Sequence, residues 1–157
     1  MKSGQKIDSW ELIEFLGKGG NGEVWKAFRP ENDFVALKVL KSRQPGSEPY
    51  KRFESEIEIL QKIGARKGIV RLIDSFVPTR PVDLRPWLAM EIGTPIRKAL
   101  EKDFSLENTI DAITEIAETL SLLVQEGIYH RDIKPDNLFQ VETGLSLIHI
   151  SEPTRPY

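Results

Sequence analysis

The stretch YHRDIKPDN, residues 129–137, decides the fold of this 157-residue chain. It brings a carboxylate, an ammonium and an amide side chain close together at Asp132, Lys134 and Asn137. Such a group of polar side chains can belong to a functional site. An ordinary polar turn is the alternative for these residues, and the sequence around the stretch has to distinguish the two.

A long helix is predicted just before this stretch, over residues 105–126. Ser105 can cap its start and Gly127 can end it. Six apolar positions at helical spacing form one stripe: Leu106, Ile110, Ile113, Ala117, Leu120 and Val124. Periodicity alone predicts that this stripe is part of a hydrophobic core.

The N-terminal part of the chain is predicted to form strands and one helix. Alternating apolar positions and turn residues between 10 and 40 indicate a three-stranded antiparallel meander. Residues 50–63 are predicted to form a helix with one apolar face, which Gly64 ends. IVRLIDSFV (69–77) and PWLAMEI (86–92) are predicted to be two further strands.

A glycine-rich stretch, LGKGGNGEV, places Gly17, Gly19 and Gly22 in G-x-G-x-x-G spacing. Backbone N–H groups can approach phosphate oxygens where no Cβ intervenes, and glycine can adopt the angles that such a loop requires. A plain hairpin turn and a dinucleotide-binding loop share this spacing. The dinucleotide-binding loop requires a helix next, whereas residues 23–28 (EVWKAF) have a strand-like pattern.

Lys38 follows Val35, Ala36 and Leu37 in VALK, so its stem has to cross a buried sheet. A buried ammonium group needs a carboxylate partner. The next predicted helix offers Glu54, Glu56 and Glu58, which lie on different faces. Glu56 lies at the edge of the apolar face and is the best candidate, and the other two are expected to face solvent.

With these motifs in order, the chain resembles the eukaryotic-type serine/threonine protein kinase family over about residues 10–144. The landmarks are G-x-G-x-x-G-x-V, V-A-L-K, a glutamate on the next helix and H-R-D-x-K-x-x-N. The resemblance implies an α+β, bilobal, protein-kinase-like fold. Its small, ATP-binding lobe (8–92) would be complete, with an antiparallel sheet and one helix, and its mostly helical large lobe (93–144) would be incomplete.

The resemblance also implies catalytic roles. Asp132 would accept the proton of a substrate hydroxyl, Lys134 would contact the transferred phosphoryl group, and Asn137 would ligate Mg²⁺. Lys38, paired with Glu56, would hold the phosphates of ATP. Sugar and aminoglycoside phosphotransferases share H-x-D-x-x-x-x-N, but the complete HRDIKPDN, with its arginine and lysine, argues against them. The lysine two positions after the catalytic aspartate indicates serine/threonine specificity.

The same resemblance implies contacts to the nucleotide. AMEIG (89–93) would be the hinge, with Met90 as the gatekeeper and the backbones of Glu91 and Gly93 bonded to adenine. The other implied ATP contacts are Leu16, Gly17, Gly19, Gly22, Val24, Ala36, Lys38 and Phe139. The expected cofactors are ATP and Mg²⁺, and the expected partner is a protein substrate phosphorylated on serine or threonine.

The last residues depart from the family pattern. The sequence contains no D-F-G and no A-P-E motif. Instead, LSLIHISEPTR (145–155) resembles the in-frame translation of a transposon-end sequencing adapter, so 145–157 are expected to be an artefactual tail. A natural strand, LSLIHI, is the alternative. Without the rest of the large lobe, we expect the apolar stripe on the helix at 105–126 to be uncovered and the chain to be inactive as given. The alternative function is a non-catalytic nucleotide-binding or pseudokinase module.

The composition is that of an ordinary globular chain, with a net charge of −2. That charge gives no indication of nucleic-acid or membrane-surface binding. The sequence has no cysteine, which excludes disulfides, and no apolar run of the ~18 residues that could span a bilayer. The first residues lack the apolar region of a signal peptide, and a cytoplasmic location is expected.

Overall fold

In the computed structural model, the chain forms two compact units, each with its own sheet. The first unit comprises Met1–Glu58 and Leu72–Ile92, and the second comprises Ile59–Arg71 and Gly93–Tyr157. The residues that the structure describes are 1–19, 22–30, 32–80, 83–102, 105–141 and 144–147.

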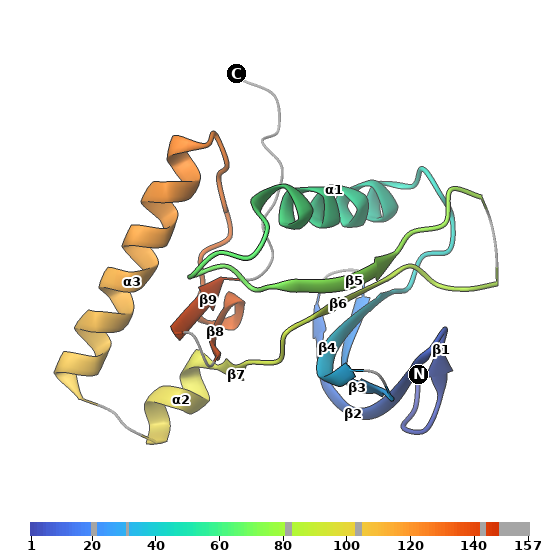
Figure 1. Cartoon of the computed structure of the whole chain (residues 1–157), viewed down its shortest axis with the longest axis horizontal. Coiled ribbons are helices and arrows are strands. Elements are labelled where there is room, and N and C mark those ends of the chain that lie inside the picture. The colour runs from blue at the N-terminus through green and yellow to red at the C-terminus, as the bar shows by residue number, and fades with distance from the viewer. Residues whose placement is uncertain (20–21, 31, 81–82, 103–104, 142–143, 148–157) are drawn as a thin grey trace. The chain divides into compact units, whose positions relative to one another are not determined.

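The first unit contains a six-stranded antiparallel sheet with strand order β1-β2-β3-β4-β6-β5 (Figure 1). Its strands are β1 (Lys6–Ile7), β2 (Trp10–Gly19), β3 (Gly22–Arg29), β4 (Asn32–Leu40), β5 (Leu72–Phe76) and β6 (Trp87–Met90). The meander β2–β3–β4 and the two later strands confirm the strand predictions. The short edge strand β1 was not predicted.

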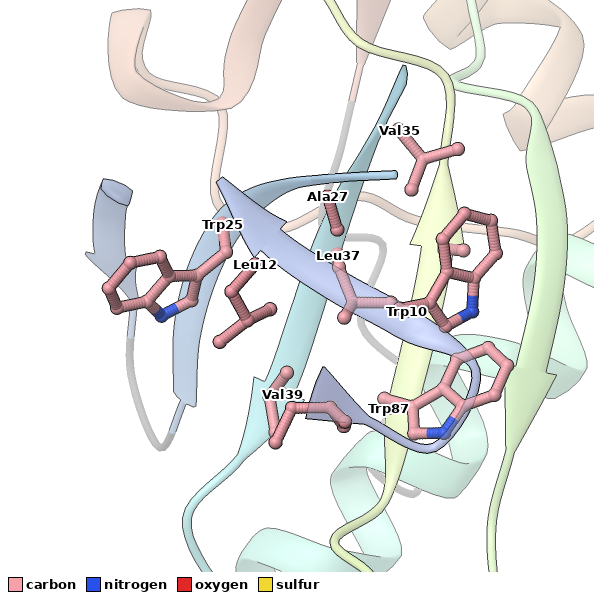
Figure 2. Packing of buried hydrophobic residues seen from close by; sticks show 10 residues of the cluster. Trp10, Leu12, Trp25, Ala27, Val35, Leu37, Val39 and Trp87 are labelled. Carbon is pink, nitrogen blue, oxygen red and sulfur yellow. The ribbon is translucent and has the colours of Figure 1, made fainter. Parts of the chain in front are cut away.

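One face of this sheet carries the hydrophobic core of the first unit (Figure 2). Val35, Leu37 and Val39 alternate along β4, so they share this face, and all are buried. Trp10 and Trp87 meet edge to face, with ring centroids 6.1 Å apart. Burying each large apolar side chain stabilises the fold by about 1.5–3 kcal/mol, so these residues hold the sheet together.

Helix α1 (Glu48–Ile63) has the apolar face that its sequence predicted. Phe53, Ile57, Leu60 and Ile63 are all buried. Gly64 follows with φ +68°, a conformation that glycine adopts without a steric penalty, and the helix ends there. The predicted helix over 50–63 is therefore confirmed, with an earlier start.

The second unit combines helices with a three-stranded antiparallel sheet of order β7-β8-β9. Its elements are β7 (Thr94–Pro95), α2 (Ile96–Lys102), α3 (Leu106–Gln125), a 3₁₀ turn (Pro135–Asn137), β8 (Leu138–Val141) and β9 (Gly144–Leu147). The Ser105 hydroxyl oxygen accepts a hydrogen bond from the backbone N–H of Asn108 at 3.0 Å, which confirms the predicted cap of α3. Within the described part of the chain, no helix is long and apolar enough to cross a bilayer.

The predicted core stripe of α3 is not buried. Leu106 is 75% exposed and Ile113 is 61% exposed, while the buried residues of the helix are Thr119 and Leu123. The burial inferred from periodicity was therefore wrong, because β9 and the segment around Gly68 pack on a different face of the helix. A Cβ at Gly68 would lie 1.9 Å from the Thr119 hydroxyl oxygen. The uncovered patch that was predicted for this helix is confirmed among the described residues.

Strand β9 includes the first residues of the predicted artefactual tail. Leu147 is 1% exposed, its N–H donates to the Gly68 carbonyl oxygen at 2.8 Å, and its carbonyl oxygen accepts from the Val70 N–H at 3.1 Å. Residues 145–147 thus belong to the sheet, whatever DNA encoded them. Residues 148–157 lie outside the described part of the chain, and the origin of the tail stays a prediction.

Candidate active site

The glycine-rich stretch forms the turn end of the β2–β3 hairpin. Gly19 is paired with Gly22, and the two residues between them lie outside the described part of the chain. A Cβ at Gly17 or Gly19 would meet no atom within 4 Å, whereas a Cβ at Gly22 would lie 2.8 Å from the Val39 carbonyl oxygen. Close packing on β4 therefore requires Gly22, while Gly17 and Gly19 leave open space beside the backbone, as a bound phosphate would need.

Four predicted nucleotide contacts lie on one face of the same sheet. Val24 on β3 is the cross-strand partner of Lys38 on β4, and Ala36 on β4 is the partner of Met90 on β6. Cross-strand partners share a face, and so do residues two apart on a strand. The sheet register therefore brings Val24, Ala36, Lys38 and Met90 together beside the hairpin.

Lys38 is paired with a buried carboxylate from α1. Its ammonium nitrogen lies 2.7 Å from one carboxylate oxygen of Glu56 and 2.6 Å from the other. The two side chains are 14% and 6% exposed. Glu54 is half-buried and Glu58 is exposed, so Glu56 is the glutamate that the structure brings to Lys38. The pair holds a positive charge at a fixed place on the sheet face, where it could meet anionic oxygens.

The HRDIKPDN stretch folds into a loop around Asp132. One carboxylate oxygen of Asp132 accepts two hydrogen bonds, from the Lys134 ammonium at 2.7 Å and from the Asn137 side-chain amide nitrogen at 3.0 Å. The Asn137 amide also donates to the Asp132 carbonyl oxygen at 2.8 Å. Two donors on one oxygen fix the orientation of the carboxylate, as a group that accepts a proton from a positioned substrate requires.

The backbone before Asp132 is held in an unusual conformation. Arg131 has φ +60°, which costs a non-glycine residue about 1–3 kcal/mol. The buried His130 lies beside it, and the Asp132 N–H donates to the His130 carbonyl oxygen at 2.9 Å. The loop therefore stores strain at the point where it presents the Asp132 side chain.

Oxygen atoms suited to Mg²⁺ are present in this loop but are few. Asn137 is buried and uses its amide nitrogen on Asp132, so its amide oxygen is the atom suited to a cation. Among the described residues, no group of three or more histidine, cysteine, aspartate or glutamate side chains could hold a metal ion. The donors fit Mg²⁺ in type, but phosphate oxygens and water would have to supply most of its ligands.

Comparison with known proteins identifies this arrangement. The protein kinase domain model matches residues 10–151. The chain belongs to the protein kinase family. The predictions of a protein kinase fold and of a serine/threonine kinase by family are confirmed by this match and by the relatives described next.

Several named serine/threonine kinases resemble this kinase chain. It is 31% identical over 142 residues to "Serine/threonine-protein kinase Pkn1" of Myxococcus xanthus, which covers 88% of the chain and 20% of the relative. It is 33% identical over 138 residues to "Aurora kinase C" of Mus musculus, which covers 84% of the chain and 48% of the relative. The kinase chain thus spans from a fifth to about half the length of these two relatives.

Solved structures support the fold. The crystal structure of the Mycobacterium tuberculosis PknI kinase domain matches with a TM-score of 0.70 and 23% identity. The match covers 95% of the kinase chain and 61% of the PknI chain. It shows that both units have the local architecture of a kinase domain.

The remaining predicted nucleotide contacts are divided between the two units. Leu16 is exposed on β2, while Glu91, half-buried, follows β6. Gly93 belongs to the second unit, where a Cβ on it would lie 2.9 Å from the Cβ of Phe139, a half-buried residue of β8. Close packing therefore requires glycine at 93, and the roles of these residues toward adenine stay predictions.

One contact to the HRDIKPDN loop was not predicted from the sequence. The Arg97 guanidinium lies 3.5 Å from the Asp136 carboxylate, and both side chains are exposed. Arg97 belongs to α2, a short helix with too few turns to give a clear periodic pattern. The contact ties α2 to the 3₁₀ turn that carries Asn137.

Proposed function

We propose that the chain is the ATP-binding and catalytic-loop portion of a serine/threonine protein kinase that uses Mg²⁺. The reaction would transfer the terminal phosphoryl group of ATP to a hydroxyl group of a protein substrate. The observation that carries this proposal is the Asp132 carboxylate held by Lys134 and Asn137. Phosphoryl transfer needs positioning and charge stabilisation more than covalent help from the protein, and this loop offers both.

Each charged residue has a distinct task in this proposal. Asp132 orients the substrate hydroxyl and accepts its proton as the new bond to phosphorus forms. Lys134 balances the charge of the phosphoryl group, and Lys38, fixed by Glu56, neutralises phosphate oxygens of ATP. Mg²⁺ supplies further charge neutralisation when bound, and Asn137 would hold it.

We expect the chain as given to bind ATP but to transfer its phosphoryl group poorly. A second metal-binding aspartate, the one in D-F-G, is absent from its sequence. Without that carboxylate the metal is held mainly by phosphates, so its charge is poorly fixed in the transition state. This absence also favours the second candidate function, a nucleotide-binding module that acts without transfer.

Nucleotide binding can be measured directly on the 157-residue chain. Titration calorimetry with ATP, with and without Mg²⁺, should give a binding isotherm that Lys38→Met weakens about tenfold or more, because one charge-assisted contact to phosphate is lost. Lys41→Met is the matched control, since Lys41 is exposed and near Lys38 in sequence. Equal affinity of both variants and the unchanged chain would refute the assigned role of Lys38.

Phosphoryl transfer can be tested with a longer product that adds the rest of a kinase large lobe after Gly144. Incorporation of ³²P from labelled ATP into protein should be lost in Asp132→Asn and kept in Glu118→Gln, an exposed acidic residue of α3. ATP binding with no transfer by this longer product would favour the non-catalytic module. Transfer that survives Asp132→Asn would overturn the assignment of the catalytic base.

A further inference from the structure

Helix α3 carries an apolar stripe that the described part of the chain leaves largely uncovered (Figure 1). We call it the α3 stripe, and its members are Leu106, Ile110, Ile113, Ala117, Leu120 and Val124. The exposed fractions of four members are 75% for Leu106, 61% for Ile113, 53% for Ile110 and 49% for Val124. Together these side chains expose on the order of 400 Å² of apolar surface, which is within the range of the largest patch on a typical monomer and is often a sign of an interaction surface.

The spacing of the α3 stripe is that of a coiled coil. Its six members follow one another at intervals of four, three, four, three and four residues. This is the alternation of heptad positions d and a by which two helices pair, and it is narrower than the face with which a helix packs into a globular core. From Leu106 to Val124 the stripe is about 27 Å long, at 1.5 Å per residue. The α3 stripe is therefore suited to a second helix that lies along its length.

The α3 stripe is complementary to its own copy when the two helices run in opposite directions. An antiparallel pair, aligned about the middle of the stripe, brings Leu106 of one copy against Val124 of the second copy. The same alignment brings Ile113 against Ala117 of the second copy, so a large side chain meets a small one. A parallel pair would set the two Ala117 side chains opposite each other and leave unfilled space between the helices.

The charges on α3 are compatible with this pairing. Asp111, Glu115 and Glu118 occupy the outer heptad positions b and f, away from the α3 stripe. Glu107 stands beside the stripe at an e position, and the antiparallel alignment places it near Ser121 of the second copy. Like charges therefore do not face each other across the pair, whereas a charged partner would find no ion pair in the stripe. Packing and charge together favour a second copy of the chain as the occupant.

We propose that two copies of the chain associate through the α3 stripe as an antiparallel pair with twofold symmetry. A stable interface buries about 800 Å² from each partner, and the exposed apolar surface of the stripe supplies about half of that area. The pair is therefore expected to be weak, with a Kd on the order of 10 µM. This association goes beyond the proposed phosphotransfer and does not depend on it.

The mass of the 157-residue chain in solution tests the association. Sedimentation velocity from about 1 µM to about 200 µM should show a change from the monomer mass of 17.9 kDa to twice that mass. Ile113→Glu places a charge at the middle of the stripe and should raise the Kd about tenfold or more. Leu122→Glu is the matched control, because Leu122 is 55% exposed on the same helix but occupies an outer f position, and it should change the Kd by less than about twofold.

Disulfide cross-linking tests the direction of the pair. The sequence has no cysteine, so an introduced cysteine is the one thiol of each chain. In a mixture of Leu106→Cys and Val124→Cys chains, oxidised glutathione should yield chiefly the mixed dimer, which its mass identifies. This result does not require the Ile113→Glu variant to fold, and far-UV circular dichroism checks that folding separately. A monomer at every concentration, an equal rise of the Kd in Leu122→Glu, a mass beyond two copies, or disulfides chiefly between identical Leu106→Cys chains would each overturn the proposal.

Discussion

Removing either partner of the Lys38–Glu56 ion pair should destabilise the first unit strongly. The ammonium and carboxylate are 2.6 Å apart and are 14% and 6% exposed, so neither charge would regain full hydration when its partner is lost. Breaking a buried pair in this way costs about 3–5 kcal/mol, and the slightly exposed lysine places this pair near 3 kcal/mol. Glu56→Leu and Lys38→Met should each show a loss of this size.

The double variant should recover most of that loss. Leucine and methionine are apolar and similar in volume to the residues they replace, and such replacements of buried pairs are often neutral. Urea unfolding followed by tryptophan fluorescence is a suitable assay, because Trp10, Trp25 and Trp87 are all buried in the first unit. We expect a coupling energy of about 3 kcal/mol or more between the two sites.

An exposed pair at the start of α1 provides the control. Glu48 and Lys51 are 3.6 Å apart, with side chains 73% and 60% exposed. Their coupling energy in the same assay should lie below about 0.5 kcal/mol. If Lys38 and Glu56 also couple by less than about 0.5 kcal/mol, the buried pair does not form in solution and the placement of the Lys38 charge is wrong.

Three further predictions concern packing and pH. Gly22→Ala should lower the free energy of unfolding by about 1–3 kcal/mol, because its Cβ would clash with a backbone oxygen of β4. Gly19→Ala, whose Cβ meets no atom, should lower it by less than about 1 kcal/mol. Equal melting temperatures of the two variants would contradict this prediction. Burial raises the pKa of the Tyr50 hydroxyl above 10.0, so the folded state favours the neutral phenol. The free energy of unfolding should therefore fall as the pH rises past 10.0, and urea unfolding of Tyr50→Phe should show a smaller fall. The Trp25 indole donates a hydrogen bond to the Glu23 carboxylate and lowers the pKa of that carboxyl below 4.5. The ionised Glu23 therefore stabilises the fold above pH 4.5, and this stabilisation is lost as the pH falls through the pKa of the folded state. An acid-unfolding curve that Glu23→Gln leaves unchanged would contradict this prediction.

The elements predicted from the sequence are those whose signal is local. The alternation Val35, Leu37, Val39 indicated β4, and Ser105 with Gly127 marked the two ends of α3. The short pieces β1, β7 and α2 were missed, because two to seven residues carry too little periodicity to stand out from a loop.

The candidate site was predictable to the extent that its residues are close in sequence. Asp132, Lys134 and Asn137 fall within six positions, so the loop that joins them can be recognised from the order of its residues alone. The choice of Glu56 over its neighbours rested on one helical face and agrees with the observed pairing. No comparable signal marks the groove lined by α2, α3, β8 and β9, because only tertiary packing brings these four elements together.

Helix α3 shows why a correct period does not settle which side is buried. Its period fits a helix, and its apolar side chains occupy two faces, one with Leu123 and one with Leu106 and Ile113. A helix that is apolar on more than one face is suited to contacts on more than one side. Periodicity selected the face with the longer apolar row, whereas the described neighbours of the helix, β9 and the segment around Gly68, cover the other. Burial is thus decided by which neighbours pack against the helix, and those neighbours are set by glycine at 68 and by the β8–β9 pairing, neither of which lies within the helix sequence.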